Sequence, residues 1–315
     1  MNTQLQLDSQ VRERLAGAIT QLERIILGKG TEIRLCLACL FARGHLLIED
    51  IPGVGKTTLA HALAATLGLG FQRIQFTSDL LPADIIGVSV FDRETGSFKF
   101  HPGPIFTQVL LADEVNRATP KTQSALLEAM EERQVTTEGE TRPLPDPFFV
   151  IATQNPSHQV GTFPLPESQL DRFLMRIQLG YPGADAERAL LQGTSRRTLL
   201  TQLAPCIEPD ELASLCAGVG RVHASSALID YLQALIRHTR SAPEFAAGLS
   251  PRAGLALLQA ARAWALMDGR GEVLPEDVQA VIPGVVGHRL HSSERHDRID
   301  GAEMASRLIA AVAIP

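Results

Sequence analysis

The chain has 315 residues, of which 45% are hydrophobic and 20% are charged, with a mean hydropathy of +0.06. This composition excludes a disordered or fibrous protein, and the length allows about two domains. The formal net charge of −6 and a pI near 5.9 argue against a nucleic-acid partner, because proteins that bind phosphate backbones usually carry a positive excess. No apolar run approaches the ~20 residues that a membrane-spanning helix needs.

The four cysteines are too few to cross-link a chain of this length, so reduced thiols and a cytoplasmic location are predicted. Residues 1–14 mix acidic and basic side chains and lack the apolar stretch of a secretory signal. We therefore expect a soluble protein without a membrane span or a disulfide framework.

The first half of the chain alternates between two patterns. Residues 7–27 are predicted to form a helix, and from about residue 45 to 180 short apolar runs typical of buried strands alternate with stretches of helical spacing. This alternation predicts a parallel sheet with helices on its faces. The expected strands are 45–49, 71–76, 109–112 and 148–153, and the expected helices between them are 57–67 and 121–132.

An all-helical part is expected after residue 183. Ser250 is a candidate N-cap before Pro251, and Pro275 suits the first turn of a helix. Glycine and proline in the segment 179–183 break any continuing element, so we predict two domains, residues 1–183 and 184–315. The expected helices of the second domain are 184–193, 208–218, 225–239, 251–267 and 275–282.

Residues 87–100 interrupt the alternation of strands and helices with two alternating runs around Glu94-Thr95-Gly96. This pattern is typical of a β-hairpin in which Gly96 takes a positive φ. The hairpin is expected to project from the core. A small local core made of Phe91, Phe98 and Phe100 is the alternative.

Two histidines near the carboxyl end, His288 and His291, are spaced three residues apart. The neighbouring Arg289 disfavours a metal cation at this place, because like charges repel each other. We therefore predict that both imidazoles are solvated surface groups.

A glycine-rich loop follows the predicted strand 45–49 and leads into the predicted helix 57–67. Glycines let backbone N–H groups approach a phosphate, and the helix N-terminus adds partial positive charge. Lys56 is placed to reach the β- and γ-phosphates, and the Thr57 hydroxyl to bind Mg²⁺. An ordinary glycine-rich turn is the alternative. The predicted binding residues are Gly53, Val54, Gly55, Lys56, Thr57 and Thr58.

Two acids end the buried strand 109–112. Asp113 is placed to hold Mg²⁺ through water, and Glu114 to polarise the attacking water. Exposed carboxylates at the end of a strand are the alternative, but together with the phosphate loop the pair indicates nucleotide hydrolysis rather than binding alone. The sequence lacks an Asn-Lys-x-Asp stretch that would read guanine, so ATP with Mg²⁺ is the predicted ligand.

The order of these motifs resembles that of the MoxR branch of the AAA+ ATPases, in the helix-2-insert clade. The resemblance implies an α/β P-loop AAA+ parallel-sheet core with a C-terminal all-helical lid, and ATP between the two. Asp50 stands where the general pattern has glycine, but Glu-Asp before the loop is a common form in this family. The matching segments, between about residues 26 and 290, are Arg43–Thr57, Leu110–Ala118, Val150–Pro156, Leu165–Phe173 and Leu249–Ala253.

The resemblance also implies roles for two polar residues outside the loop. Asn155 resembles sensor 1, an amide that bonds the γ-phosphate or orients the water. A turn residue before Pro156 is the alternative. Arg252 resembles sensor 2 on the lid, and an ordinary arginine on a helix surface is the alternative.

Arg172 resembles the arginine finger, which in this family acts on the nucleotide of a neighbouring subunit. A cationic fork of this kind neutralises charge that develops on the γ-phosphate. A local salt bridge with Asp171 or Glu167 is the alternative. Arg117 is a further candidate for an inter-subunit contact. The sequence leaves open whether the arginines act on their own subunit's nucleotide or on that of a neighbour.

The family likeness implies a ring, expected to be a hexamer, that remodels protein clients. Proteins with a von Willebrand A domain are the expected partners, in complex maturation or cofactor insertion. The hairpin at 87–100 resembles the helix-2 insert, which touches the client or the pore. Three alternatives are a magnesium-chelatase-type motor subunit, a nucleic-acid motor and a nucleotide-gated binding module. The acidic balance argues against the second and the intact acid pair against the third.

Overall fold

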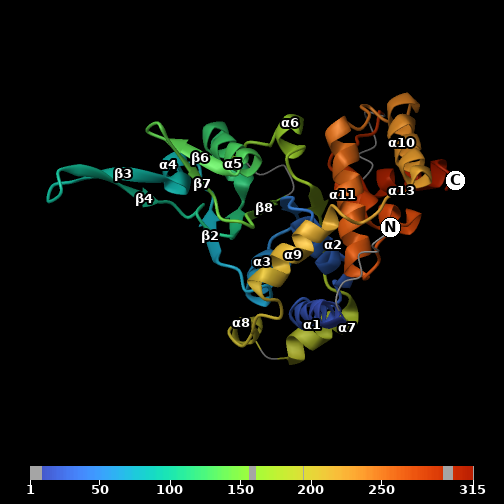
Figure 1. The fold of residues 1–315 in the computed structure, drawn as a ribbon, viewed down its shortest axis with the longest axis horizontal. Helices are drawn as coiled ribbons and strands as arrows, with labels where there is room; N and C mark the ends of the chain where they lie inside the picture. Colours follow the sequence, from blue (N-terminus) through green and yellow to red (C-terminus); the bar gives the residue numbers. More distant parts are fainter. Residues whose placement is uncertain (1–8, 156–160, 194, 294–300, 315) are drawn as a thin grey trace.

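The computed structural model describes residues 9–155, 161–193, 195–293 and 301–314 (Figure 1). Pro156, which belongs to one of the predicted motifs, lies outside the described residues. The core is a five-stranded sheet of order β2-β5-β8-β1-β9 in which every pair of neighbours is parallel. The four predicted strands are confirmed, and β9 is an additional one. The strands are Phe71–Gln75 (β2), Val109–Asp113 (β5), Phe149–Gln154 (β8), Leu46–Glu49 (β1) and Met175–Ile177 (β9).

Alternate side chains of the strands enter two separate cores, one on each face of the sheet. Leu46 and Ile48 of β1 pack with the first three helices, whereas Leu47 packs with α5 on the opposite face. Both faces are therefore covered, as expected for a parallel sheet whose strands are continuous apolar runs. The helices concerned are Ser9–Ile25 (α1), Gly30–Phe41 (α2), Lys56–Thr66 (α3) and Pro120–Glu132 (α5).

The carboxyl-terminal part is helical as predicted, with α8 and α13 in addition. Ser250 caps α11 by accepting a hydrogen bond from the Ala253 N–H (3.1 Å). Helices α11 and α12 pack on each other, and α12 also contacts β9. The helices are Ala184–Gln192 (α7), Arg196–Leu200 (α8), Pro209–Val219 (α9), Ser226–Ser241 (α10), Pro251–Met267 (α11), Pro275–Val286 (α12) and Gly301–Ala311 (α13).

The contacts of the first carboxyl-terminal helices cross the predicted domain boundary. Helix α8 contacts α1 and α3 of the core, and α9 contacts both α2 and α11. In Figure 1, α7 and α8 lie close to α1, away from α10 and α13. The boundary between residues 183 and 184 therefore stays a prediction.

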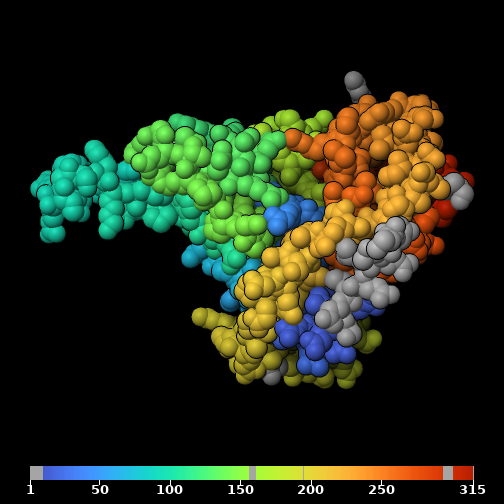
Figure 2. All heavy atoms as spheres, viewed as in Figure 1, coloured from blue at the N-terminus to red at the C-terminus, as the bar shows by residue number. Residues whose placement is uncertain are grey.

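A long β-hairpin projects from the molecule (Figures 1 and 2). Its strands, Gly87–Asp92 (β3) and Ser97–Pro102 (β4), pair antiparallel after the short helix α4 (Pro82–Ile86), and Gly96 has a φ of 65° as predicted. Phe91 and Phe98 face each other across the strands but are 52% and 70% exposed, so they form no buried core. A second hairpin, Gln134–Thr137 (β6) with Glu140–Pro143 (β7), was not predicted.

The prediction of a solvated His288 is wrong, whereas His291 is exposed. His288 is 2% exposed, and its Nε2 lies 3.1 Å from the Phe173 carbonyl oxygen. The reason is that α12 packs against β9, so the residues that follow the helix are covered by the core. In the described part of the chain, no helix is long and apolar enough to cross a membrane.

His45, directly before β1, is buried as a neutral imidazole. Its Nε2 lies 3.0 Å from the Met130 carbonyl oxygen, and its Nδ1 accepts a hydrogen bond from the Val150 N–H (3.0 Å). A proton on Nδ1 would face the proton of that N–H group. Burial lowers the pKa of His45 to about 4.

This burial makes part of the stability dependent on pH. The unfolded chain, with a histidine pKa near 6.5, binds more protons than the folded protein between pH 4 and 6.5, so stability is lost as the pH falls through this window. We expect the advantage of the wild type over His45→Gln in unfolding free energy to shrink by up to about 3 kcal/mol between pH 7 and pH 4. Urea unfolding of both proteins measures it, and a difference independent of pH would contradict it.

Candidate functional site

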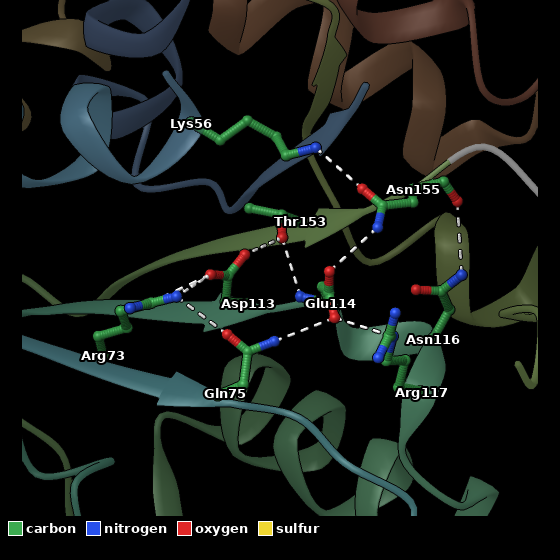
Figure 3. A network of polar contacts seen from close by, with 9 residues as sticks. All are labelled: Lys56, Arg73, Gln75, Asp113, Glu114, Asn116, Arg117, Thr153 and Asn155. Carbon is green, nitrogen blue, oxygen red and sulfur yellow. Dashed lines mark hydrogen bonds and ion pairs between the residues drawn. The ribbon is translucent and has the colours of Figure 1, made fainter. Parts of the chain in front are cut away.

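Four parallel strands end at one edge of the sheet, and polar groups stand at each of these ends (Figure 3). The glycine-rich loop follows β1, Gln75 ends β2, Asp113 ends β5, and Asn155 follows β8. Because these strands are neighbours in the sheet, their polar groups meet in one place. The carboxyl edge of a parallel sheet is where such folds bind ligands.

The glycine-rich loop leaves the start of α3 open to an anion. Gly53 and Gly55 have φ values of 87° and 100°, a conformation that residues with a Cβ rarely adopt. Gly55 precedes α3, and no side chain caps the helix, so the N–H groups of its first turn are available. A cavity of about 450 Å³ adjoins the loop and is also lined by Leu27 and Tyr181. The loop and its cavity therefore fit a nucleotide.

Lys56 connects the loop with the neighbouring strand. Its Nζ donates hydrogen bonds to the carbonyl oxygens of Asp50 and Ile51 (the latter at 3.1 Å) and to Asn155 Oδ1 (3.2 Å). Burial lowers the pKa of Lys56, and the nearby carboxylates of Asp50, Asp113 and Glu114 counteract that effect. The ammonium group therefore lies between the start of the loop and the residue that follows β8.

Glu114 is held by three side chains. Its Oε1 accepts a hydrogen bond from Asn155 Nδ2 (3.1 Å), and its Oε2 accepts one from Gln75 Nε2 (3.1 Å) and pairs with Arg117 Nε (2.8 Å). Its backbone has a φ of 57°, which turns the chain sharply after β5. The three donors fix the orientation of the carboxylate, as a group that polarises water requires.

Asp113 is the carboxylate predicted to hold magnesium. Its Oδ1 accepts a hydrogen bond from Thr153 Oγ1 (2.6 Å), and its Oδ2 pairs with Arg73 Nη2 (2.7 Å). The Thr57 residue is exposed in the first turn of α3. A hydroxyl and a carboxylate are oxygen ligands of the kind that Mg²⁺ prefers, so the residues present fit this ion.

Three residues that contact Asp113 or Glu114 were not predicted: Arg73, Gln75 and Thr153. Gln75 ends the observed strand β2 as Asp113 ends β5, but the predicted strand 71–76 extends one residue further and does not mark Gln75 as a strand end. Arg73 precedes it by two residues and lies on the same face, where its Nη2 also donates to Gln75 Oε1 (2.9 Å). Thr153 lies inside an apolar strand, and its sequence context gives no signal.

Asp50 ties the phosphate loop to the chain that follows β9. Its carboxylate is buried, and its Oδ2 accepts hydrogen bonds from the N–H groups of Leu179 and Gly180, both at 2.6 Å. Its Oδ1 accepts a further bond from the Ile51 N–H (2.8 Å). Gly180 and Tyr181 line the cavity beside the loop, so Asp50 holds together two walls of that cavity.

Arg172 and Arg252 lie elsewhere, in a cavity of about 300 Å³. Arg172 precedes β9, at the amino edge of the sheet, and its Nε pairs with Glu131 Oε2 (3.1 Å). Arg252 Nη2 pairs with the other oxygen of Glu131 (2.5 Å). Arg172 therefore forms a local salt bridge, but with Glu131 rather than with Asp171 or Glu167, the two acids of the predicted alternative; Asp171 pairs with Arg289.

This second cavity is rich in positive charge. Among the described residues, none lines both this cavity and the one beside the phosphate loop. Five arginines stand against two acids: Arg43, Arg133, Arg172, Arg252, Arg289, Glu131 and Asp171. Such an excess favours an anionic group.

Comparisons with known proteins agree with this architecture. Residues 45–175 match the family described as "ATPase family associated with various cellular activities (AAA)", and residues 237–309 match the AAA lid domain. Over 96% of the chain, the sequence is 44% identical to YeaC of Bacillus subtilis (95% of that protein) and 39% identical to chaperone MoxR1 of Mycobacterium tuberculosis (82% of that protein).

A solved structure has the same fold as this chain. A crystal structure of a protein from Cytophaga hutchinsonii superimposes with a TM-score of 0.88 and is 34% identical, covering 97% of this chain and 96% of that one. A parallel sheet with a phosphate loop, an acid pair and a helical lid defines an AAA+ ATPase. Within that class, the chain belongs to the MoxR family.

Asp50→Ala tests the contact between the phosphate loop and the segment after β9. The change leaves the buried N–H groups of Leu179 and Gly180 without their acceptor, so we expect a loss of about 3 kcal/mol in unfolding free energy and weaker ADP binding. Asp84→Ala is the control, because it removes an exposed carboxylate that bonds one N–H group at the start of α4. Urea unfolding and calorimetric titration measure both effects, and equal behaviour of the two variants would contradict the role of Asp50.

Proposed function

We propose that this protein is a magnesium-dependent ATPase whose active site is divided between neighbouring subunits of a ring. The observation that carries the proposal is the position of Arg172 and Arg252 at the opposite edge of the sheet from the phosphate loop. The family resemblance implies that both arginines act on the triphosphate of ATP. Within one protomer, however, both pair with Glu131. In this proposal, a second subunit brings these arginines to a nucleotide held by Lys56.

The direction of the strands supports this division. The phosphate loop follows the carboxyl end of β1, whereas Arg172 precedes the amino end of β9, and Leu46 of β1 pairs with Met175 of β9. The four residues of β1 alone span about 13 Å. Arg172 and the loop therefore lie on opposite sides of the sheet's length, as expected for a finger that acts on the neighbour.

Within one subunit, the phosphate loop and its surroundings supply the other half of the chemistry. Lys56 and the open N–H groups of α3 would hold the phosphates, and Thr57 and Asp113 would hold Mg²⁺, which would neutralise phosphate charge. Glu114 takes a proton from the attacking water, and Asn155, bonded to both Lys56 and Glu114, orients that water. The arginines of the neighbour stabilise the charge that develops on the γ-phosphate.

The biological part of the proposal rests on the family. We propose a hexameric ring in the cytoplasm that remodels protein clients, with von Willebrand A domain proteins as partners, and with residues 1–183 as core and 184–315 as lid. The relative from Mycobacterium tuberculosis is named a chaperone. The projecting hairpin β3–β4, with Phe91 and Phe98 exposed, offers an apolar surface for such a client.

Glu114→Gln tests the hydrolytic assignment. The amide keeps the shape of the side chain but cannot accept the proton, so we expect ATP binding to persist while turnover falls by about 10²- to 10⁴-fold. Glu128→Gln, an exposed change on α5, is the matched control. A coupled ATPase assay and binding of a fluorescent ATP analogue measure the two quantities. Turnover near the wild-type rate would refute Glu114 as the base.

Arg172→Ala tests the division between subunits. Alone, this variant should lose about 10³-fold in turnover. Mixed with equal amounts of Glu114→Gln subunits, about a quarter of the interfaces in a head-to-tail ring join an intact acid with an intact arginine, so activity should recover to a comparable fraction. The separate proteins at the same total concentration are the controls. A mixture no more active than its parts would rule out a finger that acts in trans.

A further inference from the structure

We propose that Arg289 is the positioning residue that fixes Arg172 and Arg252 as a preformed pair for the triphosphate of a neighbouring subunit. The inference rests on the proposed function and extends it to a residue that no sequence motif marked. Arg289 touches neither a nucleotide loop nor the finger's side chain. It acts on the backbone that carries the finger.

Arg289 is a buried charge with one carboxylate partner among the described residues. Its side chain is 7% exposed, and its Nε pairs with Asp171 Oδ1 at 2.7 Å. Burial lowers the pKa of Arg289, and Asp171 counteracts that effect. Removing a charged group from water is costly unless its donors are satisfied, so the surroundings of Arg289 must supply further acceptors.

Three of those acceptors are backbone carbonyl groups on both sides of Arg172, and a fourth is the carbonyl group of Val285 in α12. Arg289 Nη2 donates to the carbonyl oxygens of Asp171 (3.1 Å) and Phe173 (2.7 Å), and its Nη1 donates to that of Leu174 (3.2 Å). The segment lies between α6 (Glu167–Leu170) and β9, outside any regular helix or strand. One rigid guanidinium fork therefore holds the backbone of the turn that presents Arg172.

The same contact extends to Arg252 through Asp171. The second oxygen of Asp171, Oδ2, accepts a hydrogen bond from Ser250 Oγ (3.5 Å), and Ser250 is the N-cap of α11. Arg252 is the second residue of that helix. We call residues 171–174, which carry Arg172, the finger turn. Arg289 follows α12 in the lid and thus fixes the finger turn and the start of α11 relative to each other.

Glu131 shows what the fixed pair can hold. One carboxylate pairs with both arginines, through Oε2 to Arg172 Nε (3.1 Å) and through Oε1 to Arg252 Nη2 (2.5 Å). The two guanidinium groups are therefore spaced to share one anionic group with at least two oxygens. A terminal phosphate has this chemistry, and the ring would bring it to this cavity from the adjacent subunit.

The test uses full-length protein and separates two roles of Arg289. If Arg289 serves only the neighbour, Arg289→Met subunits keep their own phosphate site and fail only as donors of the finger. Alone, we expect them to lose at least about tenfold in turnover, with unchanged affinity for an ATP analogue. Mixed with equal amounts of Glu114→Gln subunits, they should recover as much activity as Arg172→Ala subunits do in the same mixture.

Arg289→Lys keeps the charge beside Asp171 but lacks the fork that reaches several carbonyl groups, so its turnover should lie between those of the wild type and Arg289→Met. If Arg289→Met does not fold, the same measurements are made on Arg289→Lys. Arg270→Met is the matched control, because Arg270 is a lid arginine whose guanidinium pairs with Asp277 and Asp268 and does not contact the finger turn. Its folded protein should keep wild-type turnover.

One outcome overturns the inference: ATPase activity recovers when Glu114→Gln subunits are mixed with Arg172→Ala subunits but not when they are mixed with subunits of the Arg289 variants. That outcome means that each subunit needs Arg289 for its own site. Wild-type turnover of folded Arg289→Met overturns it as well. Absence of recovery with Arg172→Ala overturns the division between subunits, and the inference with it.

Discussion

The five strands of the sheet run in one direction, and this constraint decides where the functional groups can stand. Every polar residue that follows a strand lies at the carboxyl edge, and every residue that precedes one lies at the amino edge. The phosphate loop, Asp113 and Asn155 belong to the first group, and Arg172 belongs to the second. Because the two groups lie at opposite edges, we propose that the ATPase chemistry is shared between two subunits.

The strand β9 connects the two edges, and buried charges hold it at both ends. After β9, the carboxylate of Asp50 accepts the N–H groups of Leu179 and Gly180. Before β9, the guanidinium of Arg289 donates to the carbonyl groups of the finger turn. A short strand with few ladder bonds is thereby fixed by groups that the loop and the lid supply. Since buried charges need their partners, the contacts of Arg289 join the lid to the segment that carries Arg172.

Arg176, in the middle of β9, adds a third contact of this kind. Its Nη1 pairs with Glu49 of β1 (2.7 Å), and its Nη2 donates to the Gly287 carbonyl oxygen in the lid. Glu49 lies directly before Asp50. The start of the phosphate loop, the strand β9 and the lid are therefore linked through ionised groups rather than through apolar packing alone.

The sequence predicts the half of the site that depends on local patterns. A run such as Val109–Ala112 followed by two acids places those acids at the end of a buried strand, and the loop before α3 carries its own glycines. It does not predict β9, whose three residues include a charged one, nor the partners of distant side chains. Glu131 was not expected to hold Arg172, and His288 was expected in solvent, because these contacts depend on how the lid and the core pack together.

The most direct test of the divided site is a cryo-electron microscopy structure of the Glu114→Gln protein assembled with ATP and Mg²⁺. Our account predicts that the guanidinium groups of Arg172 and Arg252 lie within about 3 Å of the γ-phosphate held by Lys56 of the adjacent subunit, and have left Glu131. A structure in which either arginine binds the nucleotide of its own subunit, or in which both stay on Glu131 in a closed ring with ATP bound, would contradict it.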